Sequence, residues 1–191
     1  MTTEVISTMP ALRAGFIGSG FMAEVHSRAA RSARADLVGL ASSSLDSAFA
    51  AATRLGVARA YGSADELIAA DDIDVIHICS PNATHAAYAS AALAAGKRVI
   101  CEKPLATSGD DAEVLADLAV STGLTATVPF VYRFHPMVRE ARARVAAGQL
   151  GTLFTVRGSY LQDWLLTPTD DNWRVNPDAG GPSRAFADIG S

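Results

Sequence analysis

The sequence is poor in several features that mark special classes of protein. Of its 191 residues only two are cysteines, Cys79 and Cys101, which are too few for a disulfide scaffold, and we expect both thiols to be reduced. The formal charge is -4 at pH 7 and no basic stripe is present, so we expect no nucleic-acid partner. No run approaches the roughly 20 apolar residues that a membrane-spanning helix needs. These absences favour a soluble globular protein.

Two further scarcities concern the start of the chain and its lysines. The first ten residues lack the basic start and apolar stretch of a secretory signal, so we expect residues 1–10 to form a flexible leader of a cytoplasmic protein. Of the sixteen basic residues, only Lys97 and Lys103 are lysine. A lysine in such a chain suggests a position that arginine could not serve.

The first 130 residues alternate short β-branched runs with longer alanine-rich stretches, which is typical of βαβ units around a parallel sheet. The runs are nearly continuous in apolar residues, as in strands buried on both faces. The predicted strands are 12–17, 36–41, 74–79, 98–101 and 124–128, and the predicted helices are 21–32, 47–55, 64–70, 84–95 and 110–122.

The pattern changes after residue 128. Residues 136–147 are predicted to form a helix, and residues 152–161 alternate apolar and polar side chains as a half-exposed antiparallel strand does. We therefore assign residues 11–128 to a first domain and residues 129–191 to the start of a mostly antiparallel α+β domain. Residues 162–191 are predicted to be a long functional loop.

A glycine motif follows the first predicted strand and opens the first predicted helix. It matches the pattern GxGxxG/A, in which glycines allow a tight turn and close approach to a pyrophosphate, while the helix N-terminus supplies N–H donors. The motif predicts a dinucleotide site that includes Gly18, Ser19, Gly20, Phe21 and Met22.

The end of the second predicted strand indicates which dinucleotide binds. An acid there would bind the ribose of NAD and repel the 2′-phosphate of NADP. The chain has Ser42, Ser43 and Ser44 instead, and Asp46 is better explained as an acid in the first turn of a helix. No arginine adjoins the serines in sequence. NAD and NADP both remain candidates, and the hydroxyls of Ser42 and Ser43 favour NADP.

Two more motifs lie where predicted strands end, at the edge of the sheet where open α/β folds bind ligands. Residues 80–85 follow one strand, and Glu102-Lys103-Pro104 follows the next. The ammonium of Lys103 can polarise a carbonyl or stabilise a developing alkoxide. Position alone equally allows an exposed lysine that pairs with Glu102.

Together these residues resemble the glucose-fructose oxidoreductase and inositol dehydrogenase family, often abbreviated Gfo/Idh/MocA. The resemblance covers residues 12–191 and depends most on Glu102-Lys103-Pro104. It also rests on Gly18-Ser19-Gly20, His26, Pro81-Asn82-Ala83-Thr84-His85, Tyr132-Arg133-Phe134 and Asp188-Ile189-Gly190-Ser191.

The resemblance implies a Rossmann doubly wound parallel sheet followed by an open antiparallel domain, with substrate held between them over the nicotinamide. Members oxidise a hydroxyl of a sugar, inositol or related polyol with NAD or NADP. The implied catalytic residues are Lys103 and Asp188, and the implied cofactor contacts beyond the glycine motif are Ser80, Pro81, Asn82, His85, Glu102 and Lys103.

The family motif that begins at Asp188 places a catalytic histidine four residues later, one position past Ser191. We therefore expect the 191-residue chain to lack full activity. The alternative is a non-catalytic regulator or interaction module that binds a dinucleotide.

Residues after position 128 complete the predicted substrate site. Arg133 lies where the chain enters the second domain, and a salt bridge to the first domain is its alternative role. Asp163 and Trp173 have side chains that suit sugar binding, although the tryptophan can equally hold the loop in place. With Lys103 and Asp188 they are the predicted contacts of a sugar or polyol.

The four histidines are not spaced as metal ligands, so no metal site is expected. We interpret His77 as a core histidine and His85 as a helix-start residue near the cofactor. Because residues 152–161 would form an exposed strand, we also expect a homo-oligomer through the sheet of the second domain.

Overall fold

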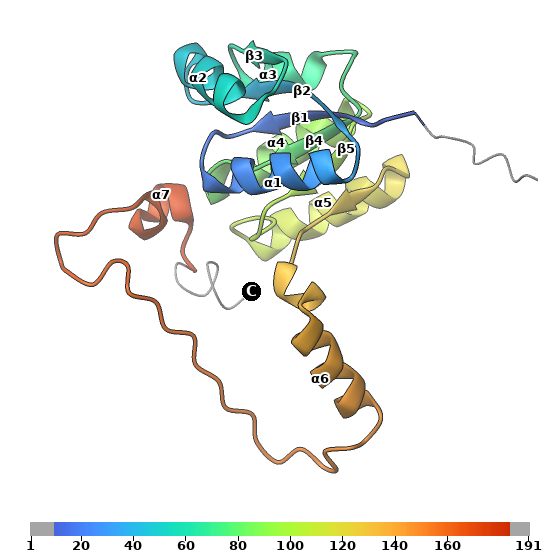
Figure 1. The fold of residues 1–191 in the computed structure, drawn as a ribbon, viewed down its shortest axis with the longest axis vertical. Helices are drawn as coiled ribbons and strands as arrows, with labels where there is room; N and C mark the ends of the chain where they lie inside the picture. Colours follow the sequence, from blue (N-terminus) through green and yellow to red (C-terminus); the bar gives the residue numbers. More distant parts are fainter. Residues whose placement is uncertain (1–9, 184–191) are drawn as a thin grey trace, which may run out of the picture.

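The structure is a computed structural model that describes residues 10–183. Its main body is one parallel sheet of six strands in the order β3-β2-β1-β4-β5-β6 (Figure 1). The order reverses direction between β1 and β4, as in a doubly wound Rossmann sheet. The strands are β1 (Arg13–Ile17), β2 (Asp36–Ala41), β3 (Arg59–Tyr61), β4 (Val75–Ile78), β5 (Arg98–Cys101) and β6 (Ala126–Thr127).

Helices connect these strands and cover both faces of the sheet. The α-helices are α1 (Phe21–Ser32), α2 (Leu45–Leu55), α3 (Ala64–Ala69), α4 (His85–Ala94), α5 (Gly109–Thr122), α6 (Pro136–Ala146) and α7 (Pro177–Gly180), and the short 3-10 helices are η1 (Asn82–Thr84), η2 (Val131–Phe134) and η3 (Trp173–Val175).

Local sequence signals set the ends of several helices. The hydroxyls of Ser44, Ser63 and Ser108 each accept a hydrogen bond from a backbone N–H in the first turn of the helix that follows. Helices α2 and α5 end at Gly56 and Gly123, whose backbones are left-handed. The sequence therefore determines both ends of α2 and α5 without help from distant parts of the chain.

Two hydrophobic cores lie on opposite faces of the sheet. Phe16 and Leu40 pack with the alanines of α1 and α2 on one face, while Ile76, Ile78 and residues of α3, α4 and α5 pack on the other. The strands are buried on both faces because helices cover each side. This sandwich holds the carboxyl ends of β1, β4 and β5 level with one another.

The predicted strands and helices of the first 130 residues are confirmed in type and order, with ends that differ by a few residues. β3 is not among the predicted strands; it has only three residues and pairs with the edge of β2. Its sequence, Arg-Ala-Tyr, is too short to show a period. Within residues 10–183 no helix combines the length and apolar character needed to cross a bilayer.

The prediction of a strand over residues 152–161 is wrong for the structure as described. This segment forms no strand, and Phe154, Val156 and Leu161 are about nine-tenths exposed. A segment with an alternating pattern becomes a strand only when it hydrogen-bonds to a neighbouring strand. No strand within residues 10–183 lies beside this segment. The mostly antiparallel sheet predicted for the second domain is therefore not formed within residues 129–183.

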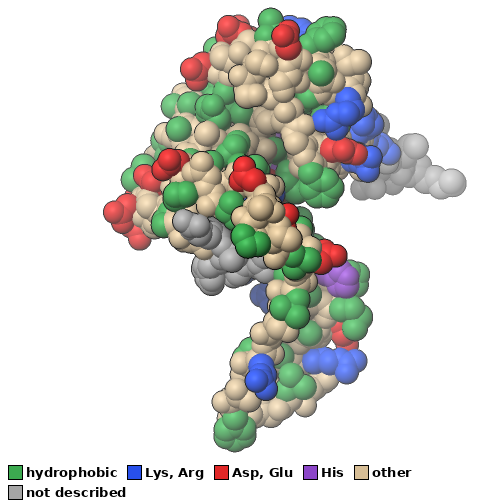
Figure 2. All heavy atoms as spheres, turned by 90° about the vertical axis from the view of Figure 1, so that its left-hand side faces the viewer, with side chains coloured by type: hydrophobic (Ala, Val, Ile, Leu, Met, Phe, Trp, Pro, Cys, Tyr) green, Lys and Arg blue, Asp and Glu red, His purple; other side chains and the backbone are tan. Residues whose placement is uncertain are grey.

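Helix α6 likewise buries none of its residues. Figure 2 shows this part of the chain projecting from the main body, with hydrophobic side chains on its surface. The segment after residue 128 has no core of its own among the described residues. The division of the chain near residue 128 stays a prediction.

The pair Arg13–Asp74 should make the stability of the sheet depend on pH. The guanidinium of Arg13 donates two hydrogen bonds to the Asp74 carboxylate, at 2.7 and 3.0 Å, and holds the pKa of Asp74 at about 2, below its ordinary 3.8. Because the folded-state pKa is the lower one, the pair stabilises the fold above pH 4 and this contribution is lost as the pH falls toward 2. We expect the urea midpoint to drop over that range.

The variant Asp74→Asn should lower the urea midpoint at pH 7 and remove this part of the pH dependence. Asp117→Asn, which changes an exposed carboxylate of α5, is the control and should behave as the unmodified chain. Equal slopes between pH 4 and 2 in Asp74→Asn and the unmodified chain would contradict the assignment.

Candidate active site

A cleft runs along the carboxyl ends of β1, β2 and β4, and we call it the glycine-loop cleft. Its volume is about 400 Å³. The residues around it come from the loop after β1, the serines after β2, the loop after β4 and one side chain of η3. Its lining includes Gly18, Ser19, Gly20, Ser42, Ser43, Cys79, Ser80, Pro81, Thr84, Tyr88 and Trp173.

The glycine loop has the backbone that a dinucleotide requires. Gly18 has a φ of +113°, and a Cβ there would lie 2.6 Å from the carbonyl oxygen of Cys79. Gly20 is the N-cap of α1, and a Cβ built on it would meet no atom within 4 Å. Open space therefore lies directly above a helix N-terminus, where N–H groups and positive potential favour a pyrophosphate. The residues present fit a dinucleotide.

Three hydroxyls gather at the end of β2. Ser42 Oγ lies 2.7 Å from Ser19 Oγ and 3.0 Å from Ser47 Oγ, so each serine is hydrogen-bonded to another. The guanidinium of Arg54, from α2, donates to the carbonyl oxygen of Ser19 at 2.8 Å. The sequence gives no sign of Arg54, because it lies twelve positions after Ser42. Helix α2 places its side chain next to the glycine loop.

A second cavity adjoins the cleft and contains Lys103; we call it the lysine pocket. Its volume is about 260 Å³, and it shares Gly20, Cys79, Ser80 and Trp173 with the glycine-loop cleft. The remaining residues come from α1, η1, the start of α4, the loop after β5 and η3. They are Phe21, Met22, Asn82, His85, Glu102, Lys103 and Arg174.

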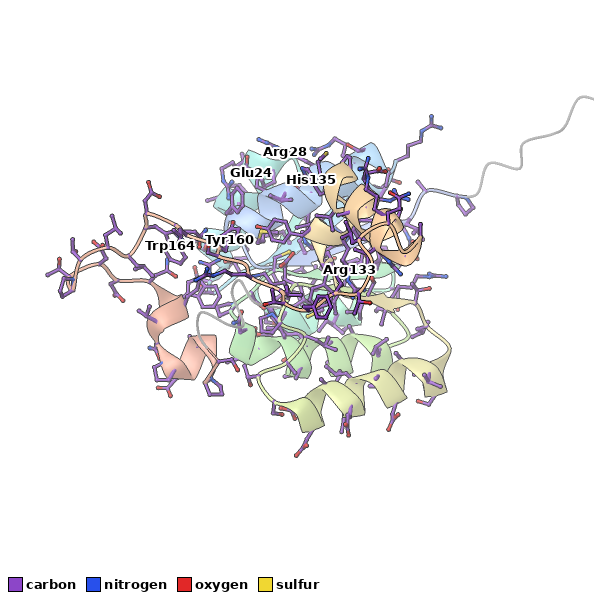
Figure 3. The ribbon with its side chains drawn as sticks, turned by 90° about the horizontal axis from the view of Figure 1, so that it is seen from below. Glu24, Arg28, Arg133, His135, Tyr160 and Trp164 are labelled. Carbon is purple, nitrogen blue, oxygen red and sulfur yellow. The ribbon has the colours of Figure 1, made fainter. Side chains whose placement is uncertain are left out.

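A third cavity, of about 750 Å³, opens from the lysine pocket toward the segment after residue 128. We call it the aromatic cavity. Figure 3 shows Arg133, Tyr160 and Trp164, which all border it. It also includes Phe21, Met22, Val25, Glu102, Lys103, Pro129, Phe130, Val131, Tyr132, Gln162, Asn172 and Arg174.

Arg174 borders both this cavity and the lysine pocket. Its guanidinium lies 4.5 Å from the ring centre of Trp173 and 5.6 Å from that of Trp164, so two indoles flank one cation. The phenol oxygens of Tyr132 and Tyr160 lie 3.0 Å apart on another wall. Aromatic faces beside guanidinium and hydroxyl groups are the surfaces that sugar sites use.

Comparison with known proteins settles the family. Residues 12–130 match the sequence model of an oxidoreductase family with an NAD-binding Rossmann fold, and residues 138–191 match the Gfo/Idh/MocA C-terminal domain. The chain belongs to the Gfo/Idh/MocA oxidoreductase family. The resemblance found in the motifs is thus confirmed.

Among the relatives of this Gfo/Idh/MocA chain is the levoglucosan dehydrogenase of Pseudarthrobacter phenanthrenivorans, 35% identical over 95% of this chain and 49% of the relative. The D-xylose 1-dehydrogenase (NADP(+)) 2 of Haloferax volcanii is 38% identical over 71% of this chain and 41% of the relative. A solved levoglucosan dehydrogenase in complex with NADH and levoglucosan matches with a TM-score of 0.88 and 34% identity over 95% of this chain and 51% of that one. The chain spans about half the length of these relatives.

The structure brings together the thirteen residues that the motifs predicted as cofactor contacts, since each lines the glycine-loop cleft or the lysine pocket. Of the predicted substrate residues, Lys103 and Arg133 border the aromatic cavity, and Trp173 borders the other two. Asp163 is exposed and borders none of the three cavities. Asp188 lies outside the described residues.

Two predicted cofactor contacts already have protein partners. The side-chain amide of Asn82 donates to the carbonyl oxygen of Gly180 at 3.0 Å, which ties η1 to α7. His85 is 1% exposed, and its Nδ1 and Nε2 lie 2.6 and 2.9 Å from the carbonyl oxygens of Pro104 and Ser80. Both side chains therefore join loops that border the cavities.

A buried chain of polar side chains lies beneath Lys103. His77 Nδ1 is 3.1 Å from His26 Nδ1, and His26 Nε2 is 3.0 Å from Glu102 Oε1. All three side chains are more than nine-tenths buried. Burial first, and then the neighbouring His26, lower the pKa of His77 to about 3. His77 is therefore neutral at pH 7 and stacks on Phe16, as expected of a core histidine.

Burial also keeps the two thiols near the site in their protonated, unreactive form. Burial, followed by the charge of Glu102, raises the pKa of Cys101 to about 12, and burial raises that of Cys79 well above its usual range. Both cysteines are free and stay protonated at neutral pH. Residues 10–183 contain no cluster of three or more acids, histidines or cysteines that could hold a metal ion.

The two motif glycines should respond differently to substitution. Gly18→Ala forces a methyl group against the Cys79 carbonyl oxygen, at a backbone position with a positive φ. We expect this variant to lower the free energy of unfolding by about 1–3 kcal/mol and also to weaken cofactor binding. Gly20→Ala meets open space, so it should cost less than about 1 kcal/mol yet weaken NADH and NADPH binding, because its methyl group occupies the approach of a pyrophosphate.

Thermal unfolding and fluorescence titration with NADH and NADPH measure the two effects separately. The informative comparison is Gly20→Ala, whose loss of affinity cannot be ascribed to unfolding. Unchanged affinity for both cofactors in Gly20→Ala would place the pyrophosphate elsewhere.

Proposed function

We propose that this chain forms the cofactor site and part of the substrate site of an enzyme that transfers hydride between NAD(P) and a hydroxyl of a sugar, inositol or related polyol. The observation that supports this most is the place of Lys103, in a pocket continuous at one end with the glycine-loop cleft and at the other with the aromatic cavity. A nicotinamide bound at the first and a polyol bound at the second would meet beside this ammonium.

The cofactor supplies the acceptor for hydride from the carbinol carbon. The protein must then stabilise negative charge on the substrate oxygen as its proton leaves. Lys103 is suited to this role because an ammonium held in a partly enclosed pocket stabilises a developing alkoxide more strongly than water does. We infer that Lys103 donates a hydrogen bond to the reacting hydroxyl and that Asp188 orients the proton acceptor.

The substrate contacts that we propose are Lys103, Arg133, Trp173 and Asp188, and Asp163 leaves the predicted set because it borders none of the three cavities. Arg133 borders the aromatic cavity and Trp173 borders the lysine pocket, and this supports their role as polyol contacts. Arg174, held between the two indoles, is an addition to this set that the structure suggests. Relatives act on levoglucosan and D-xylose, which makes these sugars and myo-inositol the first substrates to try.

For the cofactor we propose NADP in preference to NAD. Three serine hydroxyls face one another at the end of β2 without an acid among them, and the cation of Arg54 lies beside Ser19. Hydroxyl and guanidinium donors match a 2′-phosphate, whereas NAD specificity commonly uses a carboxylate at this place. Among relatives, a levoglucosan dehydrogenase binds NADH and a xylose dehydrogenase is named for NADP.

Homo-oligomerisation and a cytoplasmic location stay predictions. The exposed apolar side chains of residues 150–161 are the surface through which we propose that copies associate. Size-exclusion chromatography with light scattering over a concentration series would measure the association.

Replacing Lys103 tests the proposed reaction. In the natural gene product that contains these residues, Lys103→Met should lower kcat at least a hundredfold for the sugar it oxidises, because the alkoxide loses its partner, while NAD(P) affinity stays within about twofold. Lys97→Met is the control, since the Lys97 ammonium donates to the carbonyl oxygens of Ala70 and Ile73, and Lys97 lines none of the three cavities described above. Retained turnover in Lys103→Met would refute the role.

Cofactor preference has its own test in the 191-residue chain. We expect fluorescence titration to give tighter binding for NADPH than for NADH, and Arg54→Gln to weaken NADPH by about tenfold with little effect on NADH. Arg28→Gln is a matched control, because Arg28 and Arg54 both pair with Glu24, and it is Arg54 that donates to the carbonyl oxygen of Ser19. Tighter binding of NADH by the unmodified chain would overturn the proposal.

A further inference from the structure

Lys103 lies between two residues that are each bound by a buried histidine. Before it, Glu102 accepts a hydrogen bond from His26, which lies on α1. After it, the carbonyl oxygen of Pro104 accepts one from His85, the first residue of α4. The two helices are far apart in sequence and approach the Glu102-Lys103-Pro104 segment from different directions. We propose that His26 and His85 are positioning residues that together fix Lys103 in its pocket.

The contact on the Glu102 side continues into the core. Glu102 Oε2 accepts a hydrogen bond from the backbone N–H of Lys103 at 3.2 Å, and Oε1 lies 3.0 Å from His26 Nε2. One carboxylate thus joins the lysine backbone to α1. Because a carboxylate only accepts hydrogen bonds, His26 must carry a proton on Nε2, and one further proton lies between its Nδ1 and the Nδ1 of His77.

His77 makes this arrangement directional. Its pKa of about 3 keeps it neutral, so one ring nitrogen carries a proton, and that nitrogen is Nδ1 when it donates to His26. Phe16 stacks on the His77 ring and holds it in place, at a ring-centre distance of 4.8 Å. Three buried groups therefore have fixed orientations, and leaving any one unsatisfied would cost the folded state.

The contact on the Pro104 side joins two loops at once. His85 Nδ1 lies 2.6 Å from the Pro104 carbonyl oxygen and Nε2 lies 2.9 Å from that of Ser80. A carbonyl oxygen only accepts, and a neutral imidazole carries a proton on one nitrogen, so one of these two contacts is the hydrogen bond; the shorter distance assigns it to Nδ1 and Pro104. The ring also lies against the loop after β4, which borders the glycine-loop cleft. With a side chain 1% exposed, His85 is placed to hold loops rather than to exchange protons with solvent.

The inference rests on the proposed role of Lys103, but its first test needs no substrate. The chain has only two lysines, so labelling with ¹⁵N-lysine gives two backbone amide signals, from Lys97 and Lys103. The Lys103 N–H is itself part of the hydrogen-bonded chain, and its signal position and hydrogen-exchange rate report directly on it. The Lys97 N–H, which donates to the Ala92 carbonyl oxygen, is an internal reference.

Paired amide variants separate the two nitrogens of each histidine, because an asparagine amide reaches the place of Nδ1 and a glutamine amide that of Nε2. At His26 the contact uses Nε2, so His26→Gln should leave the Lys103 signal near its original position and His26→Asn should shift it and speed its exchange roughly tenfold. At His85 the contact uses Nδ1, so His85→Asn should preserve the signal and His85→Gln should change it.

Identical Lys103 signals in the unmodified chain, His26→Asn and His85→Gln would overturn the proposal. If a variant does not fold, the unmodified chain still tests the proposal. Long-range ¹H–¹⁵N spectra of its imidazoles must show a proton on His26 Nε2 and a proton on His85 Nδ1. A bare nitrogen at either place would equally overturn it.

Kinetics of the natural gene product then separate this inference from the proposed function. His26→Asn and His85→Gln should lower kcat by about tenfold to a hundredfold, and His26→Gln and His85→Asn should lower it less. In His26→Asn the KM for NAD(P) should change little. If the Lys103 signal responds as expected but Lys103→Met keeps full turnover, the positioning stands and the proposed role of Lys103 fails.

Discussion

The parallel pairing of β1 with β2 on one side and with β4 on the other is the constraint on which the site depends. The register places Ile17 beside both Ala41 and Ile78, so the three strands end level with one another. The N–H of Gly18 then donates to the Ala41 carbonyl oxygen at 2.9 Å, and a Cβ on Gly18 would strike Cys79. The glycine-loop cleft exists because these three chain segments leave the sheet at one edge.

The next strand extends the same edge from cofactor binding to chemistry. β5 pairs with β4, so Glu102 and Lys103 emerge beside the loop that carries Ser80. Burying Glu102 there requires partners for its carboxylate, and His26 and the Lys103 N–H provide them. The polar groups near the proposed reaction centre are thus satisfied by helices that also build the two hydrophobic cores, which couples the stability of the fold to the geometry of the site.

Most of the first 130 residues could be predicted from sequence because each signal is local. Apolar runs, serine caps and glycine ends fix strands and helices within a few residues, and the motifs at strand ends identify the cofactor cleft. The segment 152–161 shows the limit of this reasoning. Its alternating pattern indicates which side chains a sheet would bury. A strand also needs a hydrogen-bonded neighbour, and periodicity does not indicate whether another strand lies beside it.

The sequence by itself determined the family, the order of strands and helices and the residue types at the site, since glycines, serines and Glu102-Lys103-Pro104 carry their chemistry in their identity. Only the tertiary structure decided which of them meet. It brought Arg54 to Ser19, set Arg174 between Trp164 and Trp173, and turned His26 and His85 toward the two neighbours of Lys103. These contacts join residues far apart in the chain, and hydrogen bonds and burial across helices and strands leave no periodic trace in the sequence.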